Sequence, residues 1–151
     1  MSGFSIEKSF KGPVIGLDEV GRGPLAGPVV SCGCLFYSYE NLLSEIPITD
    51  SKQLTLNQRQ KLYIYFRKLK KERKMEFKLG YASVIEIDNI NILEATKLSM
   101  KRVIDKFVDK NVNLIIDRNF SIKYKNINEK SFVGGDKLSI SIAAASIIAK
   151  I

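Results

Sequence analysis

The sequence predicts an α/β domain in which helices pack on a mixed sheet. Short apolar runs that are typical of buried strands alternate with longer segments whose apolar residues recur at helical spacing. The length of 151 residues, with 45% hydrophobic and 26% charged residues, is that of one globular domain with its own core. We therefore expect a single domain over residues 1–151.

The expected strands are short, and a segment full of turn-forming residues separates the first two. They cover residues 13–18, 29–36, 75–83 and 114–116, and a further short strand is expected at 132–133. The separating segment, GRGPLAG, spaces its glycines one residue off the dinucleotide fingerprint and leads into a strand. It is therefore not expected to bind a nucleotide.

Three segments predict helices. The first runs from an N-cap at Thr55 to residue 73, the second covers 91–108, and the third covers 138–151. The third segment has almost no charge, so we expect it to be buried nearly all round.

The end of the chain carries no helix stop signal, because no Gly, Asn or Pro follows the last apolar residue. We therefore expect a fragment that ends inside a helix. On this interpretation, Ile147, Ile148 and Ile151 form an exposed apolar patch.

The chain contains no histidine, which excludes Ser-His-Asp and Cys-His nucleophile systems and a His-ligated zinc site. Cys32 and Cys34 lie one residue apart in an expected strand and are interpreted as small buried residues in a reducing compartment. The N-terminus lacks the apolar core of a signal peptide, and no stretch predicts a membrane span. We expect a soluble, cytoplasmic, monomeric protein.

The charge balance favours a polyanionic partner. The chain has 24 Lys and Arg against 16 Asp and Glu, which gives a net charge of +8. Six of these cations lie within residues 67–74 (RKLKKERK). Such a run is usually a solvated helix end, and contact with nucleic-acid phosphates is the alternative interpretation.

Four acidic residues lie at the ends of expected elements. Asp18 and Glu19 close the first strand, Asp117 follows the apolar run LII, and Asp136 follows two glycines. Neighbouring side chains of a regular strand point to opposite faces, so we expect the first strand to end or bulge at Asp18–Glu19. Any one acid is ordinarily a cap or turn residue. Together they favour a site for Mg²⁺ or Mn²⁺, which prefer oxygen ligands.

Several segments resemble, in order, the type 2 ribonucleases H, or ribonuclease HII family. DEVGRGPLAGPVV at 18–30 is similar to the opening signature of that family. Later motifs of the family are similar to TDSKQLT at 49–55, EIDNINILEATKLSM at 86–100, LIID at 114–117, GGD at 134–136 and SIAAASIIAK at 141–150. The resemblance extends over most of the chain, and it implies further C-terminal helices that the domain lacks.

The resemblance implies a ribonuclease H-like fold, with a five-stranded mixed sheet flanked by helices. By this resemblance, four acids are catalytic and hold two Mn²⁺ or Mg²⁺ ions: Asp18, Glu19, Asp117 and Asp136. The resemblance also implies that the substrate is bound by Gly21, Arg22, Gly23 and Lys52. The Gly-Arg-Gly turn would sense a ribose 2′-hydroxyl, the group that distinguishes RNA from DNA.

The implied activity is that of an endoribonuclease. It would hydrolyse the RNA strand of RNA–DNA hybrids and incise duplex DNA at embedded ribonucleotides by two-metal-ion hydrolysis, leaving 5′-phosphate and 3′-hydroxyl ends. Two alternatives stay open: a catalytically incomplete nucleic-acid-binding fragment, and another nuclease of the same fold. The chain departs from the family pattern at Arg118, where Gly is usual, and at Gly134, where Lys usually precedes the Gly-Asp pair.

Overall fold

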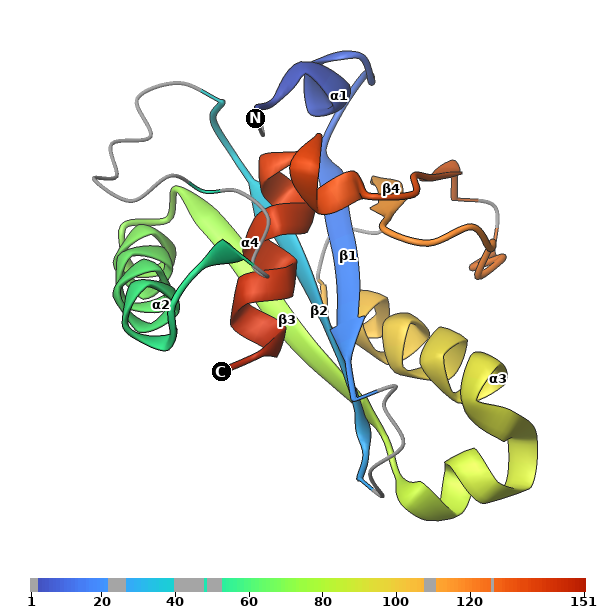
Figure 1. Cartoon of the computed structure of the whole chain (residues 1–151). Helices are drawn as coiled ribbons and strands as arrows, with labels where there is room; N and C mark the ends of the chain where they lie inside the picture. Colours follow the sequence, from blue (N-terminus) through green and yellow to red (C-terminus); the bar gives the residue numbers. More distant parts are fainter. Residues whose placement is uncertain (1–2, 22–26, 40–47, 49–52, 108–110, 126) are drawn as a thin grey trace.

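The computed structural model describes residues 3–21, 27–39, 48, 53–107, 111–125 and 127–151 (Figure 1). The elements follow in the order α1 (Ser5–Lys8), β1 (Val14–Val20), β2 (Val29–Phe36), α2 (Leu56–Lys71), β3 (Met75–Ala82), α3 (Val84–Asp105), β4 (Asn113–Ile116), β5 (Glu129–Ser131), the 3₁₀ helix η2 (Gly135–Lys137) and α4 (Ile140–Ala149).

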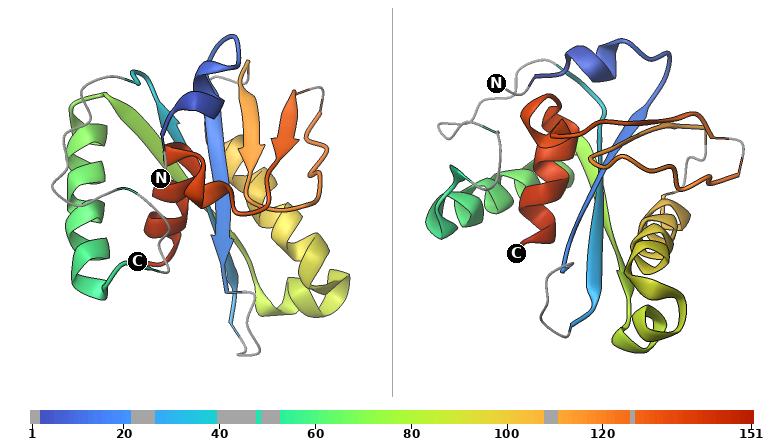
Figure 2. Two further views of the ribbon diagram at one scale, coloured as in Figure 1. Left: turned by 45° about the horizontal axis from the view of Figure 1, so that its top comes forward. Right: turned by 45° about the vertical axis from the view of Figure 1, so that its right-hand side comes forward.

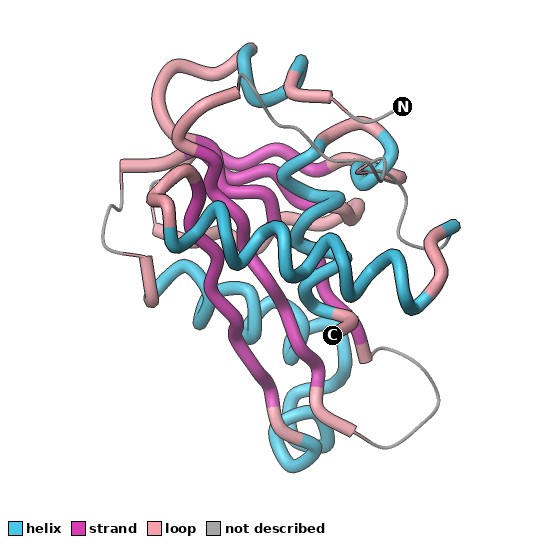
Figure 3. Tube along the Cα trace, turned by 90° about the vertical axis from the view of Figure 1, so that its left-hand side faces the viewer, coloured by secondary structure: helices cyan, strands magenta, loops and turns pink. Residues whose placement is uncertain are grey.

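The strands form one five-stranded sheet with the order β3-β2-β1-β4-β5. β1 and β2 pair antiparallel, as do β2 and β3, whereas β4 lies parallel to both β1 and β5. The sheet is therefore mixed, as the sequence predicts. Two views of the ribbon show α2 and α4 on one face of this sheet and α3 on the other (Figure 2). The tube trace also shows the helices in front of and behind the strands (Figure 3).

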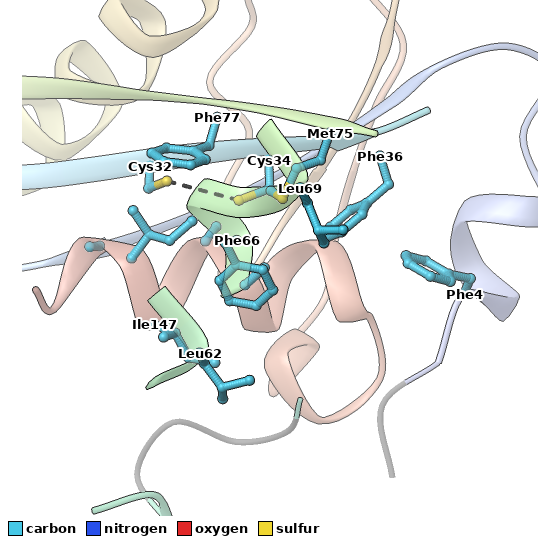
Figure 4. Close-up of a cluster of buried hydrophobic side chains, with 14 residues drawn as sticks. Phe4, Cys32, Cys34, Phe36, Leu62, Phe66, Leu69, Met75, Phe77 and Ile147 are labelled. Carbon is cyan, nitrogen blue, oxygen red and sulfur yellow. Dashed lines mark hydrogen bonds between the residues drawn. The ribbon is translucent and has the colours of Figure 1, made fainter. Parts of the chain in front are cut away.

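Alternation along the strands divides the core between these two faces. Cys32, Cys34 and Phe36 of β2 pack with residues of α2 and α4, as Figure 4 shows. Leu35, which lies between the last two, packs instead in the cluster that includes residues of α3. The two cysteines are buried and free, with their sulfur atoms 4.0 Å apart. Their role as small buried residues follows from this packing.

Both long helices begin with a capping box, in which the N-cap hydroxyl and a side chain three residues later exchange hydrogen bonds with each other's backbone. Thr55 and Gln58 form the capping box of α2, and Thr55 is the predicted N-cap of this helix. Ser83 and Glu86 form the box of α3, so this helix begins before the predicted start at residue 91. At Asn91, with a φ of 73°, the helix is interrupted, and the Asn91 side chain accepts a hydrogen bond from the Glu94 N–H.

Three other expectations are corrected. The last strand covers Glu129–Ser131 rather than 132–133, and the short helix α1 was not predicted. The predicted apolar patch at the end of the chain is wrong, because Ile147 and Ile148 are buried and only Ile151 is exposed. The two isoleucines pack in a cluster that α4 shares with α2 and β2, so residues of α2 as well as of the sheet cover them.

Within the described residues, no helix has the length and apolar character that crossing a membrane requires.

The ion pair between Glu86 and Arg102 predicts a pH-dependent part of the stability. The hydrogen bond from Arg102 lowers the pKa of Glu86 from 4.5 to about 2. Its contribution is therefore fully present above pH 4.5 and is lost as the pH falls towards 2. We expect Glu86→Gln to lower the melting temperature at pH 7, and the difference from wild type to shrink as the pH is lowered to 3. A difference that is constant with pH would contradict this assignment.

Candidate active site

One cleft, with a volume of about 370 Å³, contains all four predicted acids. Its lining residues are Asp18, Glu19, Asp117, Arg118, Val133, Gly134, Asp136, Lys137, Ser146 and Lys150. They come from β1, from the segments that follow β4 and β5, and from η2 and α4. The topology thus brings together acids that are far apart in the sequence.

β1 supplies the adjacent acids without the break that we expected. Asp18 and Glu19 pair in regular register with Cys32 and Ser31 of β2, and the strand continues to Val20. The pairing of β1 with β4 ends earlier, at Leu17. Beyond this point the β4 side of β1 is open, so side chains from both faces of the strand can reach the same cleft.

The remaining two acids are placed by the segments that follow β4 and β5. The Asp117 N–H continues the ladder by donating to the Leu17 carbonyl oxygen at 3.1 Å. The Asp117 Oδ1 accepts a hydrogen bond from the Gly135 N–H at 2.9 Å, which joins the end of β4 to η2. Asp136 is the next residue of η2. Gly134, with a φ of 69°, adopts a left-handed conformation that favours glycine, which accounts for the glycine at this position.

All four acidic residues are buried, with 4–9% of their surface exposed. Burial raises the pKa of the Asp18 carboxyl well above its ordinary value of 3.8, and the charges of Glu19 and Asp117 raise it further. The Asp18 Oδ1 accepts a hydrogen bond from the Glu19 N–H at 2.8 Å, which opposes this effect. Buried like charges favour the binding of cations, because cations offset both the desolvation and the repulsion.

Arg118 supplies a cation from within the chain. Its Nε donates to the Glu19 Oε1 at 2.7 Å, and one of its terminal nitrogens donates to the same oxygen. The Glu19 side chain is fully buried, whereas that of Arg118 is 37% exposed. The guanidinium therefore lies between the acids and the solvent.

The cleft has the donor chemistry for hard divalent cations, since its acids offer carboxylate oxygens. Among the described residues, however, no group of three or more His, Cys, Asp or Glu side chains is already arranged to hold a metal ion. Sharing a cleft is thus not the same as a ready coordination shell. The predicted convergence of the four acids on metal ions stays a prediction.

Of the predicted substrate contacts, Gly21 is described and Arg22, Gly23 and Lys52 lie outside the described residues. Gly21 follows β1 directly with a φ of 100°, and a Cβ there would lie 2.5 Å from the Pro28 carbonyl oxygen. Only glycine fits this position, which is the second residue after Glu19.

The cleft also contains residues that the sequence reasoning did not select. Lys150 donates from its Nζ to the Ser146 Oγ at 2.9 Å, four residues earlier on α4. That spacing puts both residues on one face of the helix, and it is the feature of the sequence from which their proximity could have been predicted. Arg118 was noted only as a departure from the family pattern. Nothing local in the sequence indicates that it pairs with Glu19.

The fold and the acid-lined cleft beside β1 define a ribonuclease H. Ribonuclease H2 from Pyrococcus horikoshii OT3 superposes with a TM-score of 0.69 and 29% identity, over 92% of this chain and 71% of that one. Ribonuclease HII in the PCNA complex from Archaeoglobus fulgidus superposes with a TM-score of 0.72 and 22% identity, over 91% and 71%. A structure of Bst-RNase HIII in complex with Mn²⁺ superposes with a TM-score of 0.61 and 16% identity, over 91% and 50%.

The sequence model of one protein family, Ribonuclease HII, matches residues 15–151. Ribonuclease HII of Wolbachia pipientis subsp. Culex pipiens (strain wPip) is 46% identical over 98% of this chain and 71% of its own length. Ribonuclease HII of Macrococcus caseolyticus (strain JCSC5402) is 43% identical over 96% and 52%. The chain belongs to the ribonuclease HII family. The predicted family and fold are confirmed, and the activity is that of an endoribonuclease on RNA–DNA hybrids.

The close approach of α4 to β1 generates a prediction about how the cleft is held. A Cβ at Gly16 would lie 2.6–2.7 Å from the Ser141 carbonyl carbon and the Ile142 nitrogen. Gly16→Ala must therefore push α4 away from the strand that carries Asp18. We expect a loss of about 1–3 kcal/mol in the free energy of unfolding, measured with urea.

Gly27→Ala is the matched control, because nothing lies within 4 Å of a Cβ at Gly27. Equal unfolding midpoints for Gly16→Ala, Gly27→Ala and wild type would show that α4 is not packed against β1 as described.

Proposed function

We propose that the chain hydrolyses the RNA strand of hybrids, and cuts at single ribonucleotides within duplex DNA, with Asp18, Glu19, Asp117 and Asp136 as ligands of two divalent ions. The observation that carries this proposal is the burial of four carboxylates in one cleft. Family membership supports it, and so does the Mn²⁺ complex of a protein with the same fold. Mg²⁺ is the alternative ion, since it prefers the same oxygen ligands.

The places of the acids in the cleft support a proposal for their roles. Asp18 lies near the end of β1, close enough to Glu19 and Asp117 for their charges to raise its pKa, so it would be the ligand that both ions share. Glu19 and Asp117 would hold one ion and Asp136 the other. Bound divalent ions supply Lewis-acid stabilisation of the attacking and leaving oxygens of the phosphate. A water would be the attacking group, so no protein nucleophile is required, which agrees with the absence of histidine.

The selection of ribonucleotides is assigned to the turn after β1. Gly21 follows the end of β1, two residues after Glu19, which supports the proposal that Gly21, Arg22 and Gly23 contact the substrate beside the scissile phosphate. Backbone N–H groups in a glycine turn can approach a ligand closely, and the ribose 2′-hydroxyl is both a donor and an acceptor. Lys52 is proposed as a further substrate contact. The expected products carry 5′-phosphate and 3′-hydroxyl ends.

A direct test uses the purified chain and three duplexes of one sequence: all-DNA, RNA–DNA, and DNA with one ribonucleotide. We expect cleavage of the last two only, dependent on Mn²⁺ or Mg²⁺, with 3′-hydroxyl ends that a polymerase can extend. Cutting of the hybrid alone would remove the assignment to embedded ribonucleotides. Hybrid binding without metal-dependent cleavage would favour the alternative of a catalytically incomplete nucleic-acid-binding fragment.

A basic groove of about 770 Å³ on α2 and β3 is the second surface that we assign to the substrate. Its lining residues are Tyr63, Ile64, Arg67, Lys68, Lys70, Lys71 and Phe77. α2 carries six cations and no acidic residue, which favours a phosphate backbone over a neutral partner. Lys70 is already engaged, because its Nζ lies 3.0 Å from the Glu76 Oε1 and donates to the Phe77 carbonyl oxygen.

Replacement of the acids is expected to separate catalysis from folding. Asp18→Asn and Asp136→Asn should each reduce cleavage by roughly 100-fold or more, since each removes a charged metal ligand. Without metal, Asp18→Asn should melt no lower than wild type, because it relieves repulsion among buried carboxylates. Asp88→Asn, on α3 and outside the cleft, is the control for both measurements. Full activity of Asp136→Asn would refute the four-acid assignment.

The basic groove gives a prediction about salt. Lys68 and Lys71 are exposed, so changing both to Ala should weaken binding to all hybrid sequences and flatten its salt dependence. The slope of log K against log salt should fall by roughly 0.9 for each phosphate contact that is lost. Lys8→Ala with Lys11→Ala removes the same charge from the N-terminal segment and should leave the slope unchanged. Equal slopes for all three proteins would make the groove a solvated helix surface.

A further inference from the structure

A cation of the chain itself already contacts one of the proposed metal ligands. The Arg118 guanidinium donates twice to a single oxygen, the Glu19 Oε1, by way of its Nε and one terminal nitrogen. Such charge-assisted hydrogen bonds are among the strongest that side chains form. The partner carboxylate is fully buried, so the pair is only weakly screened by solvent.

The Glu19 carboxylate is also a proposed ligand of an incoming divalent ion. An ion bound to this carboxylate would lie close to the Arg118 guanidinium, and the two cations would repel each other. The present arrangement fits this conflict, since the described residues contain no ready group of three metal-ligating side chains although four acids line the cleft.

We propose that Arg118 is an internal counter-ion that holds Glu19 in the metal-free enzyme and competes with the divalent cation for it. This inference rests on the proposed role of Glu19 as a metal ligand. When metal binds, the guanidinium has to leave the Oε1, and its 37% exposed side chain gives it a route into solvent. The consequence is a lower apparent metal affinity than the four acids alone would provide.

Two substitutions at this position separate charge from size. Arg118→Gln keeps a long side chain with a hydrogen-bond donor but removes the positive charge, whereas Arg118→Lys keeps the charge. Lys150→Ala is the matched control, because Lys150 lines the same cleft but donates a hydrogen bond to the Ser146 hydroxyl rather than to an acid. It removes one positive charge from the cleft without releasing Glu19.

The experiment measures Mn²⁺ binding to the whole chain by calorimetry, together with the rise in melting temperature that Mn²⁺ causes. We expect Arg118→Gln to bind Mn²⁺ about tenfold or more tightly than wild type, which corresponds to about 1.4 kcal/mol. Its metal-induced rise in melting temperature should be larger by the same linkage. Arg118→Lys should stay near wild type, and Lys150→Ala should change the affinity by less than about threefold.

The outcomes distinguish this inference from the proposed metal site. If Asp18→Asn abolishes Mn²⁺ binding and Arg118→Gln binds no more tightly than wild type, the counter-ion role is wrong and the metal site stands. If Asp18→Asn leaves Mn²⁺ binding intact, the metal site is wrong and the inference falls with it. An equal gain in affinity from Lys150→Ala would also overturn the inference, because any cation in the cleft would then act alike.

Discussion

Repulsion among buried carboxylates is the constraint on which the rest of this structure depends. Four acids share one cleft, and their mutual charges and burial make each negative charge costly without a cation nearby. A fold that accepts this cost has to hold the acids on rigid elements, since mobile side chains would move apart. β1 and β4 are interior strands of the sheet. The hydrogen bond from the Gly135 N–H to the Asp117 carboxylate fixes η2, which carries Asp136, relative to these strands.

The packing around the cleft serves the same constraint. α4 lies so close to β1 that Gly16 has no room for a side chain, and the small residues of α4 make that approach possible. α4 also packs with Phe66 and Leu62 of α2, in a cluster that includes residues of the sheet. The wall of the cleft is therefore held by both β1 and α2, which is the kind of support that a metal centre requires from its surroundings.

Much of this arrangement could be predicted from local patterns. Apolar runs located β1 to β4, and the capping residue Thr55 located α2, because these signals depend on neighbouring residues only. β5 was misplaced because its residues, Glu-Lys-Ser, have no apolar face to detect. The start of α3 was missed although Ser83 and Glu86 have the spacing of a capping box. The burial of Ile147 could not be predicted, because the helix that covers it is distant in the sequence. The pairing of Arg118 with Glu19 was hidden for the same reason.

The interruption at Asn91 divides α3 into two parts of unequal local stability. All the buried residues of the helix follow the interruption, from Ala95 to Ile104. The first part has its capping box and is tied to the second by the ion pair between Glu86 and Arg102. The first part contributes little to the core, so its amide protons should exchange with solvent through local opening. The amide protons of the second part should exchange only on global unfolding. The ribbon shows one long helix (Figure 1), but its two parts differ in local stability. An ion pair connects them, and only the second part has residues buried in the core.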